Sequence, residues 1–73
     1  MKIYPNPSES VVFIQWYKRV NIKLTTLDGK LVKVLESTNE IDLGNLPSGN
    51  YLISIFDENN TKLKTQIITK LTK

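Results

Sequence analysis

The chain contains no cysteine and no histidine among its 73 residues. Without cysteine it can form no disulfide and no thiolate metal site. Without histidine it lacks the usual general base near neutral pH and the commonest metal ligand. A chain this short buries only about 60 % of the surface that it exposes when unfolded, so its stability depends on a small apolar core and on backbone hydrogen bonds.

Long apolar runs are absent as well. The longest, Val11–Ile14, has four residues, whereas a membrane-spanning helix needs about 20. Met1–Tyr4 leads directly into prolines, without the apolar segment of a signal peptide. The residues after Met1 already resemble the start of a domain, so we expect that Met1 is not the natural start of the protein. We therefore expect one domain over residues 1–73 and no membrane insertion.

The acidic residues do not suggest a catalytic site. Asp28 and Asp57–Glu58 lie in predicted turns, where aspartate is favoured for backbone reasons. A catalytic carboxylate pair needs a pocket that separates the two pKa values, and ligand pockets usually exceed about 300 Å³. Asp57–Asn60 offers oxygen atoms to Ca²⁺ but matches no known calcium loop. We expect no enzyme activity, no cofactor and no metal.

Positive charge is concentrated at the end of the chain. Residues 62–73 hold four of the ten basic residues and none of the seven acidic ones, so they carry +4 while the rest carries −1. Lysines on an edge strand discourage unwanted pairing, and a basic strand also suits an acidic partner. Nucleic-acid binding would need exposed aromatics among basic residues. Trp16–Arg19 offers one such cluster, but we expect Trp16 to be a core or sandwich-edge aromatic and Lys18-Arg19 to be a solvated turn.

Apolar and polar residues alternate with a period of two, which is typical of β-strands. We expect strands around Ile3, from Val12 to Trp16, and over 20–25, 31–35, 40–43, 51–55 and 62–71. Turn residues separate them, most clearly Asp28-Gly29, a strong hairpin signal. Seven short strands predict an all-β fold, a small immunoglobulin-like antiparallel β-sandwich. A single small barrel is the alternative.

The same alternation predicts which side chains form the core. In the last strand it places Ile67 in the core and leaves Lys64, Gln66, Ile68 and Lys70 on the other face. Phe13 and Phe56 point away from the predicted core. The full predicted core is Ile3, Val12, Ile14, Val20, Ile22, Leu24, Leu27, Leu31, Val34, Ile41, Leu43, Leu46, Tyr51, Ile53, Ile55 and Ile67.

Three segments in order carry a resemblance to a known family. They are Tyr4-Pro5-Asn6-Pro7, Leu27-Asp28-Gly29-Lys30-Leu31-Val32 and Leu46-Pro47-Ser48-Gly49-Asn50-Tyr51. Ile41-Asp42-Leu43 fits the acidic step between the second and third, and a lysine-bearing strand closes the chain. Over nearly its whole length the sequence resembles the C-terminal sorting domain of proteins exported by the type IX secretion system of Bacteroidota.

The resemblance implies a β-sandwich that acts as an address for an attached cargo, which becomes secreted or displayed at the cell surface. It implies recognition by the outer-membrane translocon or a shuttle protein, and removal by a sortase at a site upstream of Met1. An edge strand is a ready template for a partner, so we predict recognition through Lys64, Gln66, Ile68, Lys70 and Lys73. A mainly structural role is predicted for Pro5, Asn6, Pro7, Gly29, Lys30, Leu46, Pro47, Gly49 and Tyr51.

A second hypothesis is a non-catalytic accessory module that binds carbohydrate or protein. It predicts an aromatic platform in which Phe13, Trp16 and Phe56 share one face. Binding of a glycan that is lost in Trp16→Ala would favour it.

Overall fold

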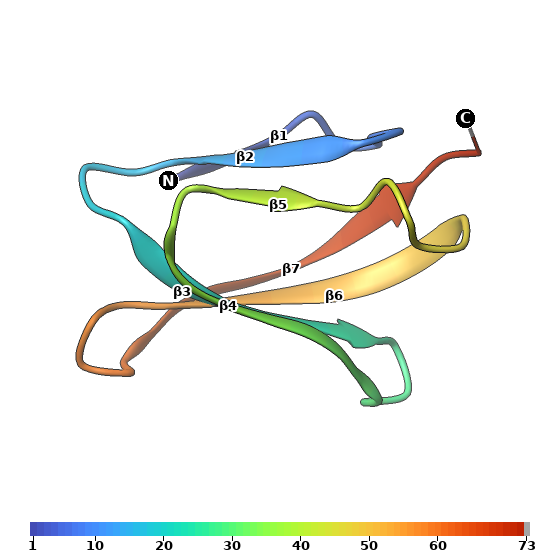
Figure 1. Cartoon of the computed structure of the whole chain (residues 1–73). Coiled ribbons are helices and arrows are strands. Elements are labelled where there is room, and N and C mark those ends of the chain that lie inside the picture. The colour runs from blue at the N-terminus through green and yellow to red at the C-terminus, as the bar shows by residue number, and fades with distance from the viewer. Residues whose placement is uncertain (73) are drawn as a thin grey trace.

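The computed structural model describes residues 1–72 and consists of strands joined by turns and loops (Figure 1). Buried residues alternate with exposed or half-buried ones most regularly in the second, third and sixth strands, as expected where one face of a sheet is packed and the other is wet. The strands are β1 (Lys2–Tyr4), β2 (Val11–Gln15), β3 (Val20–Thr26), β4 (Leu31–Thr38), β5 (Glu40–Asp42), β6 (Gly49–Phe56) and β7 (Lys62–Lys70).

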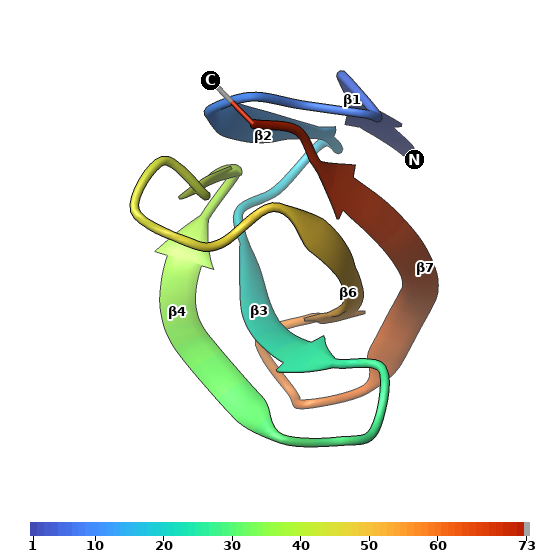
Figure 2. The same cartoon turned by 90° about the vertical axis from the view of Figure 1, so that its right-hand side faces the viewer.

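The strands form two antiparallel sheets that lie face to face. One has the order β1-β2-β5 and the other the order β4-β3-β6-β7. Figure 2 shows β7 at one edge of the larger sheet, rising toward the layer of β1 and β2. This is the predicted small β-sandwich, in two sheets rather than one closed barrel. The described residues include no helix that could span a membrane.

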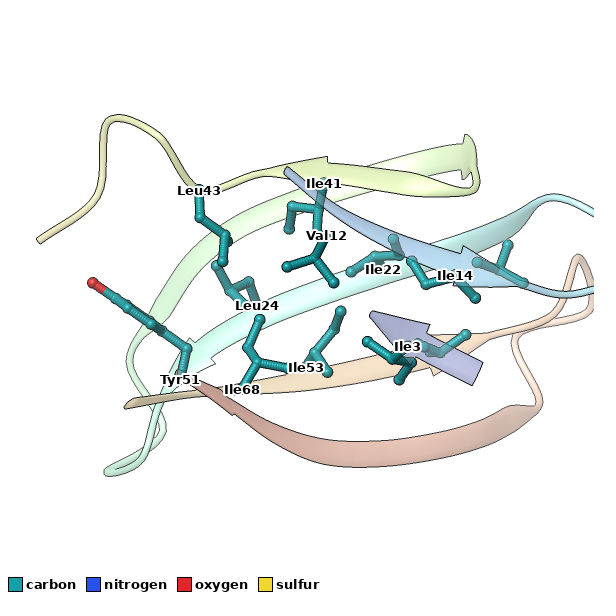
Figure 3. Close-up of a cluster of buried hydrophobic side chains, with 12 residues drawn as sticks. Ile3, Val12, Ile14, Ile22, Leu24, Ile41, Leu43, Tyr51, Ile53 and Ile68 are labelled. Carbon is teal, nitrogen blue, oxygen red and sulfur yellow. The ribbon is translucent and has the colours of Figure 1, made fainter. Parts of the chain in front are cut away.

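The core lies between the two sheets. Figure 3 shows side chains of β3, β6 and β7 pointing toward those of β1, β2 and β5. Burying such aliphatic groups contributes about 25 cal/mol per Å² of apolar surface, which is the main stabilising term in a domain without disulfides. The predicted core positions that are confirmed are Ile3, Val12, Ile14, Val20, Ile22, Leu24, Ile41, Leu43, Tyr51, Ile53 and Ile55.

The prediction for the last strand is wrong by one residue. Ile67 is 53 % exposed, whereas Ile68 is 1 % exposed and belongs to the core. The cause is the register between β6 and β7, in which Tyr51 pairs with Ile68 and Leu52 with Ile67. Directly opposed residues share a face of the sheet, so the buried Tyr51 carries Ile68 inward. A shift of one residue turns every side chain of a strand to the other face.

Three further core predictions are wrong and lie near the β3–β4 hairpin. Leu27 sits in the turn itself, and Leu31 and Val34 lie on the outer side of β4; all three are exposed. The β3–β4 pairing contains register shifts, and a bulge breaks strict alternation. Val32 and Leu35, three positions apart, therefore pack against the core in place of Val34. Leu46 is only half-buried, although it does contact the core.

The hairpin turn is held by its own side chains. Gly29 has a φ of +96°, a conformation that glycine adopts without steric cost, and its N–H donates to the Thr26 carbonyl over 3.0 Å. The Thr26 hydroxyl donates to the Asp28 carboxylate, and this hydrogen bond lowers the pKa of Asp28 below its ordinary value. Lys30 donates its backbone N–H to the Thr26 hydroxyl over 3.0 Å. Gly29 and Lys30 both take part in the hydrogen bonds of this turn.

Candidate partner-recognition strand

The last strand, β7, is an edge strand with one complete neighbour. It pairs with β6 along its whole length, from Lys62 opposite Phe56 to Lys70 opposite Gly49. Its other edge faces outward. The backbone groups of an edge strand are available to a further strand unless something covers them. What covers the outer edge of β7 therefore decides where a partner strand can pair with it.

The side chain of Asn6 covers part of this edge. Its Nδ2 donates to the carbonyl of Ile67 over 3.1 Å, and its Oδ1 accepts the N–H of Thr69 over 3.0 Å. One amide side chain thus satisfies a donor and an acceptor of the strand, as a backbone peptide of a neighbouring strand would. Asn6 lies between Pro5 and Pro7, in a loop with two cis peptide bonds, Tyr4–Pro5 and Asn6–Pro7.

Ser8 continues the cover toward the end of the strand. Its N–H donates to the carbonyl of Thr69 over 2.9 Å, and its carbonyl accepts the N–H of Leu71 over 2.8 Å. Ser8 is itself buried, and its hydroxyl accepts the N–H of Ser10 over 3.2 Å. Asn6 to Ser8, here named the clasp, therefore closes the edge of β7 from Ile67 to the end of the strand and also binds Leu71, the next residue. Sequence reasoning did not identify these contacts of Asn6 and Ser8 with the last strand.

The first half of β7 has no such cover. Because Ile67 and Thr69 direct their backbone groups toward the clasp, Thr65 directs its N–H and C=O to the same outer side. No backbone or side-chain group of the described residues pairs with these two groups of Thr65. Residues 62–66, here named the open segment, therefore keep a free edge beside the closed one.

The predicted recognition side chains lie on the inner side of the strand. Ile68 and Lys70 are buried, the latter at 4 % exposure with its ammonium donating to the Leu71 carbonyl over 2.9 Å. Lys64 and Gln66 are half-buried opposite Ile55 and Ile53. The expectation that these four residues form an exposed face is wrong, because Ile68 shares the core side with Tyr51. Lys73 lies outside the described residues.

The turn before β6 fixes the register that buries Ile68. The Tyr51 hydroxyl donates to the carbonyl of Pro47 over 2.5 Å, closing the turn around the ring as in a tyrosine corner. Gly49 has a φ of +148°, in the region that side chains rarely adopt. The N–H of Leu46 donates to the Leu43 carbonyl over 2.9 Å. These contacts hold the turn from Leu46 to Tyr51 together.

We expect Tyr51→Phe to lower the free energy of unfolding by about 1 kcal/mol, the net value of one hydrogen bond. The ring stays in the core, and the exposed Pro47 can hydrate its freed carbonyl, so the loss should not exceed that range. Chemical denaturation of both proteins measures it. The matched control is Tyr17→Phe, whose ring is exposed and whose unfolding midpoint should stay unchanged. A loss in both variants would contradict the assignment.

The aromatic platform of the second hypothesis is not assembled. Phe13 lies on the outer side of the smaller sheet, where its ring centroid is 5.8 Å from that of Tyr4. Phe56 lies on the outer side of the larger sheet, with the ammonium groups of Lys23 and Lys62 at 5.4 and 5.8 Å from its centroid. Trp16 follows β2 in a loop. The three rings therefore do not share one face.

Lys18 and Asp57, from the basic cluster and the acidic turn considered above, both have local partners. Lys18 forms an ion pair with Glu58 over 3.2 Å, which raises the pKa of Lys18. Both side chains are exposed, so the pair adds little stability. The Asp57 carboxylate accepts the N–H groups of Asn59 and Thr61, each over 2.9 Å, which is ordinary turn chemistry. The described residues contain no cluster of acidic side chains arranged to hold a metal.

Comparison with known proteins gives one match. A family model described as a secretion system C-terminal sorting domain matches residues 2–70. No curated protein and no solved structure matches the chain. The matched range includes both the clasp and the whole of β7.

Proposed function

The chain belongs to the family of secretion system C-terminal sorting domains, and from that premise we propose that the export machinery recognises it by adding a strand to the open segment of β7. Such a domain is the sorting signal of the type IX secretion system, and it marks an attached protein for export across the outer membrane to the cell surface or the medium. As cargo, it interacts with that machinery.

The observation that carries this proposal is the uneven cover of the β7 edge. The clasp pairs with the strand from Ile67 onward, while the outward groups of Thr65 stay free. Main-chain pairing with an exposed edge gives affinity, and side-chain pockets add specificity. A free edge next to a closed one limits an incoming strand to a single register. This is the property that a general address needs, because it must be read in the same way on every cargo.

Lysines within the open segment support an acidic partner. Lys62 is exposed and Lys64 half-buried, at the start of the strand where an incoming chain would pair. Charges at the rim of an interface speed association and select partners more than they add affinity. In this proposal the partner is a translocon or shuttle protein of the outer membrane, and the domain is a substrate of the sortase without catalysis of its own. The family is a secretion signal, which accords with that role.

A reporter exported from the periplasm tests the proposal. Residues 1–73 are fused to the C-terminus of a periplasmic reporter in a host with an active type IX system, and the exported fraction is measured. We expect Thr65→Pro to reduce export at least about tenfold, because proline removes the free N–H, and it is tolerated on edge strands. The β6–β7 pairing does not use that N–H. Thr65→Val, which keeps the N–H and the branched shape, is the matched control and should be exported normally.

Thermal unfolding of the purified variants is the control for folding, and we expect both to remain folded. Equal export of folded Thr65→Pro and of the intact fusion would refute strand addition at this edge. Deleting residues 64–73 should also abolish export, but it removes Ile68 from the core as well. The deletion therefore tests whether the domain is needed, and the proline substitution tests how it is read.

A further inference from the structure

A row of three apolar side chains and one threonine crosses the outer face of the larger sheet. Leu31 on β4 pairs with Thr25 on β3, Thr25 pairs with Leu52 on β6, and Leu52 pairs with Ile67 on β7. Opposed residues share a face, so these four side chains form one line across all four strands. Leu31 is 56 % exposed, Ile67 53 % and the nearby Val34 49 %. We name Thr25, Leu31, Val34, Leu52 and Ile67 the outer apolar surface.

A hollow lies next to this row. Its volume is about 340 Å³, and its lining includes Val34, Phe56, Lys23 and Glu36. Val34, which belongs to the outer apolar surface, also lines the hollow, so the surface and the hollow are continuous. An apolar strip beside a recess that could accept a side chain is the usual form of a protein-docking surface, in which one anchor enters a pocket.

The fold does not require these residues to be apolar. The core between the sheets is complete without them, and the outer face of an antiparallel sheet is normally polar. Three of them, Leu31, Val34 and Ile67, look like core residues in the sequence and yet are exposed in the structure. Contiguous exposed apolar groups mark interaction sites when they are rimmed by polar residues.

Charge around the hollow indicates the partner. Two cations, Lys23 and Lys62, lie within 6 Å of the Phe56 ring centroid, at 5.4 and 5.8 Å, and one acid, Glu36, lines the same hollow. A second copy of this chain would bring like charges together, which is costly at an interface. We propose that the outer apolar surface docks onto a protein of the export machinery that presents an apolar strip with carboxylates beside it. The proposal rests on the proposed function and adds a contact separate from the β7 edge.

The test uses residues on β4, three strands away from the open segment. We expect the double variant Leu31→Ser, Val34→Ser to lower the exported fraction of the reporter fusion at least about tenfold, since each side chain lost from an interface is worth about a factor of ten. Lys23→Glu should lower it as well, by placing a like charge before the partner's carboxylates. The matched controls are Phe13→Ser, Tyr17→Ser and Lys2→Glu, which change exposed residues away from this surface and should keep export within about twofold.

The outcomes separate the two proposals. Normal export of a folded Leu31→Ser, Val34→Ser fusion overturns the docking surface while strand addition at Thr65 stands. Loss of export in Thr65→Val would count against strand addition through the backbone and leave the docking surface standing. Two further results would overturn the choice of partner. One is a dimer of the purified domain that the double variant abolishes, and the other is binding to anionic phospholipid vesicles that the double variant removes.

Discussion

Ile68→Ala is expected to lower the free energy of unfolding by about 2–5 kcal/mol, the usual cost of emptying an aliphatic position in a core. Ile68 is fully enclosed between the sheets and lies opposite Tyr51. A domain of this length has a total stability of roughly 0.05–0.15 kcal/mol per residue, so the loss is a large share of it. The measurement is chemical or thermal unfolding, and the melting temperature should fall by at least about 8 °C.

Ile67→Ala is the matched control, because it makes the same change one position earlier. The Ile67 side chain lies on the outer apolar surface, so its loss should cost less than about 1 kcal/mol, the range of strand propensity alone. The pair of variants therefore reports which face of β7 is buried. If Ile67→Ala were the more damaging, the register between β6 and β7 described above would be wrong.

Asn6→Ala is expected to lower the free energy of unfolding by about 1–3 kcal/mol, because it removes two hydrogen bonds worth about 0.5–1.5 kcal/mol each. The effect should also be local. The amide of Thr69, which donates to Asn6 Oδ1 over 3.0 Å, should exchange its hydrogen with solvent much faster than in the intact domain. Amides in the middle of β3 should keep their protection until the domain unfolds globally. Hydrogen exchange followed by NMR measures both.

Two variants make this result specific. Asn6→Asp keeps an oxygen acceptor for the Thr69 N–H but replaces the donor to the Ile67 carbonyl with a second acceptor, so it should lose part of the protection and not all. Asn45→Ala changes an exposed asparagine in a turn and should alter neither stability nor exchange at Thr69. Unchanged Thr69 exchange in Asn6→Ala would show that the clasp does not hold the strand.

The clasp and the open segment together give the last strand two different halves. The half from Ile67 to Lys70 is fixed from both sides, by β6 and by the clasp, and it places Ile68 and Lys70 in the interior. The half that begins at Lys62 is paired on one side only. A fixed half beside a free one lets a strand be rigid and still accept a partner, since pre-ordering lowers the entropy lost on binding. In this view the proline-asparagine-proline segment and the lysine-bearing strand act as one unit, although about 60 positions separate them in the sequence.

Local patterns in the amino-acid sequence are enough to predict the strands, their approximate bounds and most of the core. These follow from local rules, because a period of two and turn residues such as Asp28-Gly29 act within a few positions of the chain. The order of its three short segments also indicated the family, and the match over residues 2–70 bears this out.

The face of β7 that is buried and the groups that cover its edge depend on contacts between strands. Both Ile67 and Ile68 are compatible with the alternation of the strand, and the choice between them depends on pairing with Tyr51 in β6. The clasp likewise joins Asn6 to Thr69 across the sandwich, and the bulges that turn Val34 outward arise in the pairing of β3 with β4. Register, bulges and edge contacts are properties of two segments at once, so a periodicity read along one segment does not contain them.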